Sequence, residues 1–165
     1  MKDDDPGWGR IQGACDTMTT YTQILYHIVF GTKGHYGSLD LERHDTLCGY
    51  IAGILKHNKC MPYKLGGFID HIHILTELHP SASLAVVVKD IKLASSAWIK
   101  NEKVFPSFSG WQEGYGAFTC SWSVKNEVED YIARQREHHR HKSFKEEYIS
   151  FLRRAGIEFD ENRLG

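Results

Sequence analysis

Two histidines stand at alternate positions in the apolar segment IDHIHILTEL, which covers residues 69–78. Side chains two residues apart in a β-strand point to the same side of the sheet, so His71 and His73 are expected to lie next to each other. Ile72 and Ile74 then face the opposite side and can pack in a core. Paired imidazoles can hold a divalent cation, but surface histidines bonded to water or backbone explain this segment equally well.

A tyrosine and a glutamine four residues apart, Tyr131 and Gln135, occur in the segment SVKNEVEDYIARQREHH. Positions i and i+4 of a helix lie one turn apart on the same face. Taken singly, Tyr131 is more simply a core aromatic and Gln135 a solvated helix residue. His138 and His139 follow, and His139 competes with Gln135 for any role as a metal ligand. A cationic helix end near the helix dipole is the simpler interpretation of these two histidines.

Together these segments resemble the HUH single-tyrosine transposases, the small TnpA-type enzymes of insertion sequences that move as single-stranded DNA. The likeness covers about residues 18–161 and includes, in the order of the family, TTYTQILYHIVFGTK, DHIHILTELHPSASLAVVVKDIKLASSAWIK, FSGWQEGYGAF, YIARQREHH and SFKEEY. The resemblance implies that His71, His73 and Gln135 bind a divalent metal, Mg²⁺ or Mn²⁺. It also implies that Tyr131 is the nucleophile, and it favours Gln135 over His139 as the third ligand.

The chemistry of strand transfer explains why these residue types are needed. A tyrosine that attacks phosphorus keeps the bond energy as a 5′-phosphotyrosine and releases a 3′-hydroxyl, so the step is reversible. A free tyrosine has a pKa of about 10, and a cation on the scissile phosphate assists it by neutralising charge on the phosphoryl oxygens. Two imidazoles and an amide are neutral ligands, so they leave coordination positions and the full positive charge to the phosphate. Imidazole ligands suit Mn²⁺ better than Mg²⁺.

Three further side chains near these residues have simpler structural interpretations. Asp70 and Glu77 are close enough in sequence to orient a histidine, although a turn residue and a surface charge are the simpler roles. His27 stands at a strand position opposite the core face and is most simply structural.

Basic side chains mark two candidate surfaces for DNA. Residues 131–145 contain five basic residues and one acidic residue, and Arg134, Arg136 and Arg140 lie nearest to Tyr131. Lys89 and Lys92 share the polar side of another predicted helix. Such patches suit a phosphate backbone, although solvated helix faces look the same. Four aromatic residues could stack unpaired bases, but we expect most of them to fill a core or a subunit interface: Trp111, Tyr115, Phe118 and Trp122.

The hydrophobic pattern predicts the elements that must position these residues. Strands are expected at 21–30, 61–68, 69–78 and 115–122, and helices at 39–56, 83–101, 123–139 and 143–156. Ser123 is the predicted N-cap of the helix that carries Tyr131, and Ser143 with Glu146 forms a capping-box pattern. The order β-α-β-β-α-β followed by two helices predicts an α+β, ferredoxin-like split β-α-β fold with helices on one face of an antiparallel sheet. The other face is expected to be free for a ligand or a second subunit.

The composition of the chain limits its class. With 165 residues it is long enough for one domain with a core, and its net charge of −1 means that DNA affinity must come from local patches. No apolar run approaches the roughly 20 residues of a membrane span, and the acidic start does not resemble a signal peptide. The scattered cysteines, Cys15, Cys48, Cys60 and Cys120, argue against a zinc ribbon or a disulfide framework. We expect a cytoplasmic protein with a loose extension at 1–17 and one domain at 18–165.

The predicted function is therefore a DNA transposase that cleaves and rejoins single-stranded DNA at hairpin element ends through Tyr131. One tyrosine cuts one strand and an element has two ends, so a homodimer is expected. The sequence leaves open whether Tyr131 serves its own chain or the partner. Alternatives are a domesticated nickase of repeat palindromes, a non-catalytic nucleic-acid-binding module and a metal-dependent phosphodiesterase that uses water.

Overall fold

The computed structural model describes residues 21–164, so the predicted extension at 1–17 lies outside the described residues. Its centre is a four-stranded sheet in the order β2-β3-β1-β4. The strands are β1 (Leu25–Gly31), β2 (Met61–Phe68), β3 (His71–Glu77) and β4 (Gly116–Cys120). All three neighbouring pairs are antiparallel. This order, with helical crossovers after β1 and β3, confirms the predicted ferredoxin-like α+β fold.

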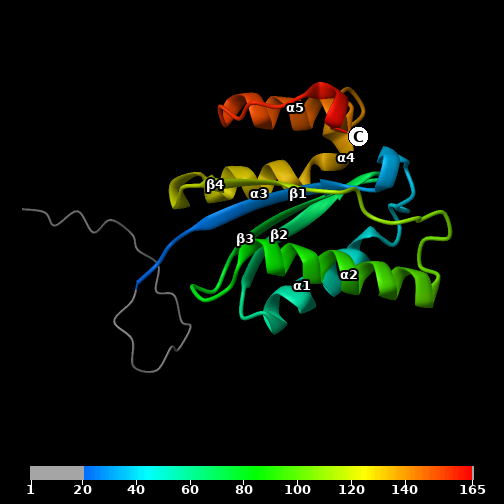
Figure 1. Cartoon of the computed structure of the whole chain (residues 1–165), viewed down its shortest axis with the longest axis horizontal. Coiled ribbons are helices and arrows are strands. Elements are labelled where there is room, and N and C mark those ends of the chain that lie inside the picture. The colour runs from blue at the N-terminus through cyan, green and yellow to red at the C-terminus, as the bar shows by residue number, and fades with distance from the viewer. Residues whose placement is uncertain (1–20, 165) are drawn as a thin grey trace, which may run out of the picture.

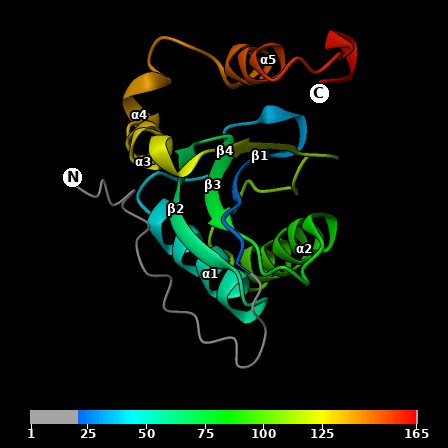
Figure 2. The ribbon, with the colours of Figure 1, turned by 90° about the vertical axis from the view of Figure 1, so that its left-hand side faces the viewer.

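Helices cover both faces of the sheet, so the molecule has three layers (Figure 1). On one face lie α1 (His44–His57) and α2 (Leu84–Glu102). On the other lie α3 (Lys125–Ala133), α4 (Gln135–His138) and α5 (Phe144–Arg154), as the turned view in Figure 2 also shows. Short 3-10 helices are η1 (Lys33–His35), η2 (Trp122–Val124) and η3 (Glu161–Arg163). The prediction of a free sheet face is therefore wrong, because the C-terminal helices occupy that face.

Alternation along the central strands explains why the sheet has two buried faces. The main core, between the sheet and α1 and α2, contains alternate residues of β1 and β3: Ile28, Phe30, Ile72 and Ile74. On the other face, Val29 packs against α5, and Leu25 and Leu75 pack against Ile132 of α3. The register pairs His71 with Gly31 and His73 with Val29. Both histidines therefore face the layer formed by the C-terminal helices.

The boundaries of the helices and strands depart from the predicted ones in several places, and β1 begins at Leu25, four residues later than predicted. The predicted helix at 123–139 is broken at Arg134, whose φ of −93° and ψ of 14° separate α3 from α4. Ser123 is not the N-cap of α3, because Val124 holds that position and the Ser123 hydroxyl instead lies 2.8 Å from the Ser121 hydroxyl. The first helix starts five residues later than predicted, at His44, after an Asp40 side chain has formed a turn by accepting from the Glu42 amide. The capping box of α5 is confirmed.

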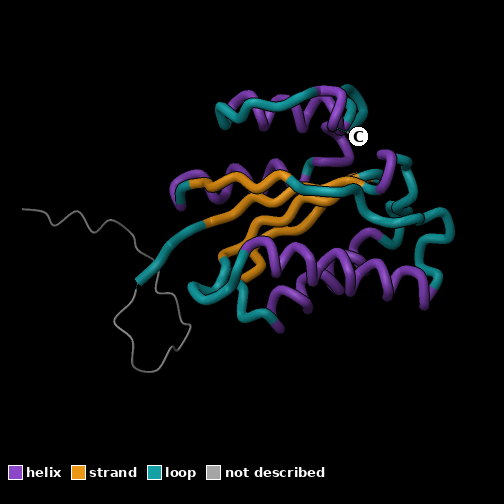
Figure 3. The backbone as a smooth tube through the Cα atoms, in the orientation of Figure 1, coloured by secondary structure: helices purple, strands orange, loops and turns teal. Residues whose placement is uncertain are grey.

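A glycine lets α3 approach the sheet closely. A Cβ atom at Gly66 of β2 would lie 2.8 Å from the carbonyl oxygen of Ile132 and 2.8 Å from a methyl carbon of the same residue. A side chain at this position would push α3 outward, and with it Tyr131, which precedes Ile132. The backbone path in Figure 3 shows α3 running over the strands on this side.

Two general features concern the described part of the chain. No helix in residues 21–164 has the length and apolar character needed to cross a membrane. Cys48, Cys60 and Cys120 are free thiols.

Candidate metal centre and nucleophile

The paired histidines of β3 are fully buried, and each has one ring nitrogen fixed by a neighbour. Nδ1 of His71 lies 2.7 Å from Oδ1 of Asp70, and Nδ1 of His73 lies 2.9 Å from Nε2 of His27. Such contacts set the orientation of each ring and leave Nε2 available. Asp70 thus orients a histidine in addition to forming a turn, whereas Glu77 accepts a hydrogen bond from the Tyr63 hydroxyl at 3.0 Å.

Gln135 and Tyr131 reach these histidines within the same chain. Gln135 is buried at the start of α4, and its Oε1 lies 3.1 Å from Nε2 of His71. Tyr131, near the end of α3, meets the ring of His73 edge-on, with 5.9 Å between the ring centroids. Its hydroxyl donates a hydrogen bond to Glu147, which also accepts from the Gln135 amide at 3.2 Å. The structure thus brings the four sequence-predicted residues into one cluster.

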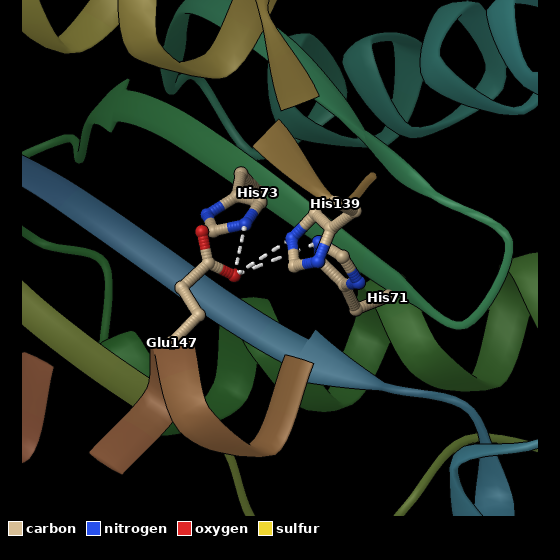
Figure 4. A group of neighbouring side chains, drawn as sticks. All are labelled: His71, His73, His139 and Glu147. Carbon is tan, nitrogen blue, oxygen red and sulfur yellow. Dashed lines mark hydrogen bonds and ion pairs between the residues drawn. The ribbon is translucent and has the colours of Figure 1, made fainter. Parts of the chain in front are cut away.

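Glu147 of α5 lies at the centre of this cluster, and sequence reasoning missed it. Its Oε2 is 3.3 Å from Nε2 of His73, 3.2 Å from Nε2 of His139 and 3.8 Å from Nε2 of His71 (Figure 4). The side chain is only 2% exposed. Burial, and then the negative charge of Asp70, raises the pKa of Glu147 to about 8. A signal existed in the sequence, because Glu147 falls on the apolar stripe of its helix, one turn from Phe144 and beside Tyr148.

His139 is part of the cluster and is not a cationic helix end. Its Nδ1 lies 2.6 Å from the Lys142 carbonyl oxygen, and this leaves Nε2 facing Glu147. Burial, and then the neighbouring His71, lowers the pKa of His139 to about 4. His138 lies at the edge of the cluster, with Nε2 3.6 Å from Oε1 of Glu147. Both candidates for a third ligand, Gln135 and His139, therefore reach the histidine pair.

Burial keeps the imidazoles of His27, His73 and His139 neutral at pH 7. Burial lowers the pKa of His27 to about 4, and burial together with neighbouring histidines holds the pKa of His73 well below its ordinary value. Nε2 of His73 is buried and, in the described part of the chain, has no hydrogen-bond partner; its contact with Glu147 lacks hydrogen-bond geometry. An uncharged ring nitrogen without a partner is what a metal ligand requires.

The residues of the cluster fit a divalent cation. His71, His73, His139 and Glu147 each offer a ligand atom, and these atoms lie within 4.8 Å of one another. Ligands at about 2.1 Å from a cation lie roughly 3 Å apart when they are adjacent in its coordination shell. Three spacings in this cluster, of 3.1 to 3.3 Å, agree with that value, and the spacing between His71 Nε2 and Glu147 Oε2 is longer, at 3.8 Å. Histidine, carboxylate and amide donors are ligands for Mn²⁺ and related ions.

Of the predicted DNA-contacting residues, the arginines lie on the side of Tyr131 and the lysines do not. Arg134 and Arg140 are exposed, and Arg136 donates to the Leu41 carbonyl oxygen at 2.7 Å. Lys89 and Lys92 belong to α2, on the opposite face of the sheet. Lys92 donates to two carbonyl groups of the loop before β4, one of them that of Gln112 at 2.9 Å, and burial lowers its pKa to about 8.

Most of the candidate stacking aromatics pack inside the protein, as predicted. Trp111 and Tyr115 pack against the main core, and the Trp111 indole donates to the Ser95 hydroxyl at 2.9 Å. Phe118 stacks on Phe151 of α5 at 5.4 Å between ring centroids. Trp122 is 38% exposed.

Known proteins share this sequence pattern and this fold. The profile of the family described as "Transposase IS200 like" matches residues 20–135. A crystal structure of a presumed transposase from Deinococcus radiodurans R1 has a TM-score of 0.56 and 24% identity, and the match covers 72% of this chain and 96% of that one. A REP-associated tyrosine transposase bound to a REP hairpin has a TM-score of 0.56 and 12% identity, with 74% of each chain covered. These two similarities show the fold alone.

The family profile ends at Gln135, so α5 and Glu147 lie beyond the matched segment. No curated protein matches the chain closely enough to count as a relative. The profile spans more than half of the sequence, including β3 and α3 with the histidine pair and the tyrosine. On this evidence the chain belongs to the IS200-like transposase family.

Proposed function

We propose that this transposase cleaves and rejoins single-stranded DNA through Tyr131, with the help of a divalent cation, Mg²⁺ or Mn²⁺. The strongest support comes from the surroundings of the Tyr131 hydroxyl. It donates a hydrogen bond to the buried carboxylate of Glu147, which also contacts the buried His73. A tyrosine with only a packing role would not need a buried carboxylate next to its hydroxyl. The proposed metal ligands are His71, His73 and Gln135.

The proposed reaction exchanges one phosphate ester for another. The phenol oxygen of Tyr131 attacks phosphorus, the bond from phosphorus to the 3′-oxygen breaks, and a 5′-phosphotyrosine and a 3′-hydroxyl result. The proton that the phenol loses is balanced by the proton that the 3′-oxygen gains. Rejoining is the reverse attack by a 3′-hydroxyl on the phosphotyrosine. When bound, the cation neutralises charge on the phosphoryl oxygens.

The remaining residues of the centre orient the reacting groups. Asp70 and His27 each fix Nδ1 of one β3 histidine, which directs Nε2 toward the place of the cation. The Gln135 amide donates to Glu147 and to the Tyr131 carbonyl oxygen at 3.5 Å, so its Oε1 stays turned toward His71. These contacts hold the ligand atoms in place before DNA arrives, which lowers the cost of assembling the reactive geometry.

A cavity gives the DNA strand access to the nucleophile. It has a volume of about 240 Å³, and its lining includes Tyr131, Phe151, the basic residues Lys142 and Arg154, and the acidic residues Glu127 and Glu147. The two positive charges suit a phosphate group, and the aromatic wall suits a base or sugar. The DNA strand is proposed to continue past the exposed Arg134 and Arg140, which lie on the same side of the sheet. Lys89, on the opposite face, is proposed to make a separate contact with DNA.

The proposed substrate is single-stranded DNA with hairpin ends, and the proposed assembly is a homodimer in the cytoplasm. A structurally similar transposase is known bound to a hairpin, which supports this class of substrate. Two nucleophiles are needed to process two element ends, which supports the dimer. Since Tyr131 meets the histidines of its own chain, each subunit is proposed to complete its centre without a partner.

The test is a covalent adduct assay with a hairpin-ended oligonucleotide labelled at its 3′ end and supplied with Mn²⁺. The wild-type chain should retain the label after denaturation, because the phosphotyrosine carries the downstream segment. Tyr131→Phe should retain none, and the control Tyr36→Phe, at an exposed tyrosine, should behave like the wild type. If Tyr131→Phe still forms the adduct, Tyr131 is not the nucleophile. Cleavage that releases free ends without any adduct identifies a water-dependent phosphodiesterase instead.

A further inference from the structure

The two oxygens of Glu147 face two different groups. Oε2 faces Nε2 of His71, His73 and His139 at 3.2 to 3.8 Å. Oε1 accepts from the Tyr131 hydroxyl and from the Gln135 amide. A single carboxylate therefore lies between the candidate metal ligands and the candidate nucleophile, and it contacts both.

The fold does not need a carboxylate at this position. Apolar contacts of Phe144, Tyr148 and Leu152 with Val29 hold α5 on the sheet. The capping box of Ser143 and Glu146 satisfies its N-terminus. A carboxylate buried among imidazole rings is costly to desolvate, and an apolar side chain of similar volume generally packs in such a place with equal or greater stability. The position of Glu147 is therefore better explained by the chemistry of the site.

We infer that Glu147 is a further catalytic residue that connects the cation to the nucleophile: Oε2 is a ligand of the cation, and Oε1 holds the Tyr131 hydroxyl next to it. This inference rests on the proposed function and adds a group that the family match, which ends at Gln135, does not contain. It makes α5 a part of the active centre. It also explains why the Tyr131 hydroxyl lies beside the proposed metal ligands.

The arrangement has a consequence for the charge at the centre. Neutral imidazole and amide ligands leave a divalent cation with its full double charge, whereas one carboxylate ligand reduces the net charge of the centre to about +1. The cation is then held more tightly by the protein alone and still attracts a phosphate. Because Oε1 accepts the hydroxyl hydrogen, the phenol oxygen keeps its lone pairs free for phosphorus.

The experiment measures Mn²⁺ binding and adduct formation separately. Glu147→Gln and Glu147→Ala are compared with the wild type and with Glu137→Gln, which changes an exposed carboxylate on α4. Calorimetric titration of the DNA-free protein with Mn²⁺ should show at least a tenfold weaker affinity for both Glu147 variants. At saturating Mn²⁺ their rate of adduct formation should remain about 100-fold below that of the wild type, as expected when a reacting group is misplaced. Circular dichroism checks that the variants are folded.

Each outcome decides one part of the inference. Unchanged Mn²⁺ affinity overturns the ligand role of Oε2. Full recovery of the adduct rate at saturating Mn²⁺ overturns the positioning of Tyr131. If the wild type forms no adduct at all, the proposed function fails, while the calorimetric comparison still decides whether Glu147 binds the metal.

Discussion

At the scale of single residues, the donor atoms of the centre determine which cation it prefers. His71 and His73, two of the proposed ligands, supply imidazole nitrogens, and His139 places a third nitrogen beside them; such nitrogen-rich surroundings favour later first-row metals over Mg²⁺. We predict an affinity order of Co²⁺ above Mn²⁺ above Mg²⁺, with Mg²⁺ weaker than Mn²⁺ by at least about tenfold. Competition titrations with the DNA-free protein measure this order. Equal binding of Mg²⁺ and Mn²⁺ would contradict a nitrogen-rich ligand set.

The histidine pair should be needed for cleavage and not for recognition. His71→Ala or His73→Ala is predicted to reduce adduct formation at least about 100-fold, because each removes a proposed ligand of the cation that would assist the attack. Hairpin affinity in a gel shift should stay within about twofold of the wild type, since both side chains are fully buried and present no surface to duplex DNA. His57→Ala, at an exposed histidine of α1, is the control. Loss of hairpin binding in both variants would indicate a structural role instead.

The residues that sequence analysis identified are those whose partners are close along the chain. His71 and His73 are two apart, and Tyr131 and Gln135 are four apart, so strand and helix geometry alone places each pair on one face. The contact of His27 with His73 spans 46 positions, and that of Gln135 with Glu147 spans 12. Such contacts depend on how whole elements pack, which residue spacing does not encode.

At the scale of elements, the close approach of α3 to β2 should control the position of Tyr131, the proposed nucleophile. Gly66→Ala is predicted to destabilise the fold by about 1–3 kcal/mol, as overpacking usually does, because the new methyl group meets the Ile132 backbone at 2.8 Å. It should also slow adduct formation, since α3 carries Tyr131. Gly49→Ala in α1 has nothing within 4 Å and should be neutral or stabilising by up to about 1 kcal/mol. Denaturant unfolding measures the loss of stability in Gly66→Ala. If this variant is as stable as the wild type, the prediction is wrong.

Helices and strands were predictable from the periodicity of apolar residues, whereas the break inside one helix was not. The pattern from residue 123 to 139 is continuous, but Ile132 packs on the sheet while Gln135 turns toward His71. The spacing gives no sign of the break at Arg134, because residues three apart, such as Ile132 and Gln135, lie on one face of a straight helix. The position of the C-terminal helices on the sheet was also unpredictable. An amphipathic pattern indicates that a helix packs through its apolar face, but it does not indicate which surface that face covers.

At the scale of the whole molecule, the order of elements identified the fold. The chain contains two split β-α-β units that run antiparallel to each other. Few orders of strands in the sheet are possible for them, because crossover connections are right-handed and short. The sheet order β2-β3-β1-β4 follows from them. The order along the chain did not reveal that the last three helices return to cover the histidine face. That feature depends on the burial of Val29, Phe144 and Leu152 against each other.

The many buried neutral histidines predict how the stability of the metal-free protein depends on pH. The pKa of His27, His44 and His139 is lowered to about 4 in the folded chain. The unfolded chain takes up protons near the ordinary value of about 6.5. Stability from these groups is therefore present above that value and is lost as the pH falls toward 4. Glu147 acts in the opposite direction, because its pKa is raised to about 8 and the folded chain binds its proton first.

As the pH falls, the loss of stability from the three histidines is larger than the gain from Glu147. In excess chelator the protein should therefore melt several degrees lower at pH 5 than at pH 7. His27→Gln should reduce this difference, since it removes a group that the unfolded chain protonates and the folded chain does not. His57→Gln, at an exposed position, should leave the difference unchanged. Thermal melts followed by circular dichroism at both pH values measure it. A melting temperature that rises from pH 7 to pH 5 would mean that the proton on Glu147 dominates, and that the imidazoles around it are charged in the folded protein.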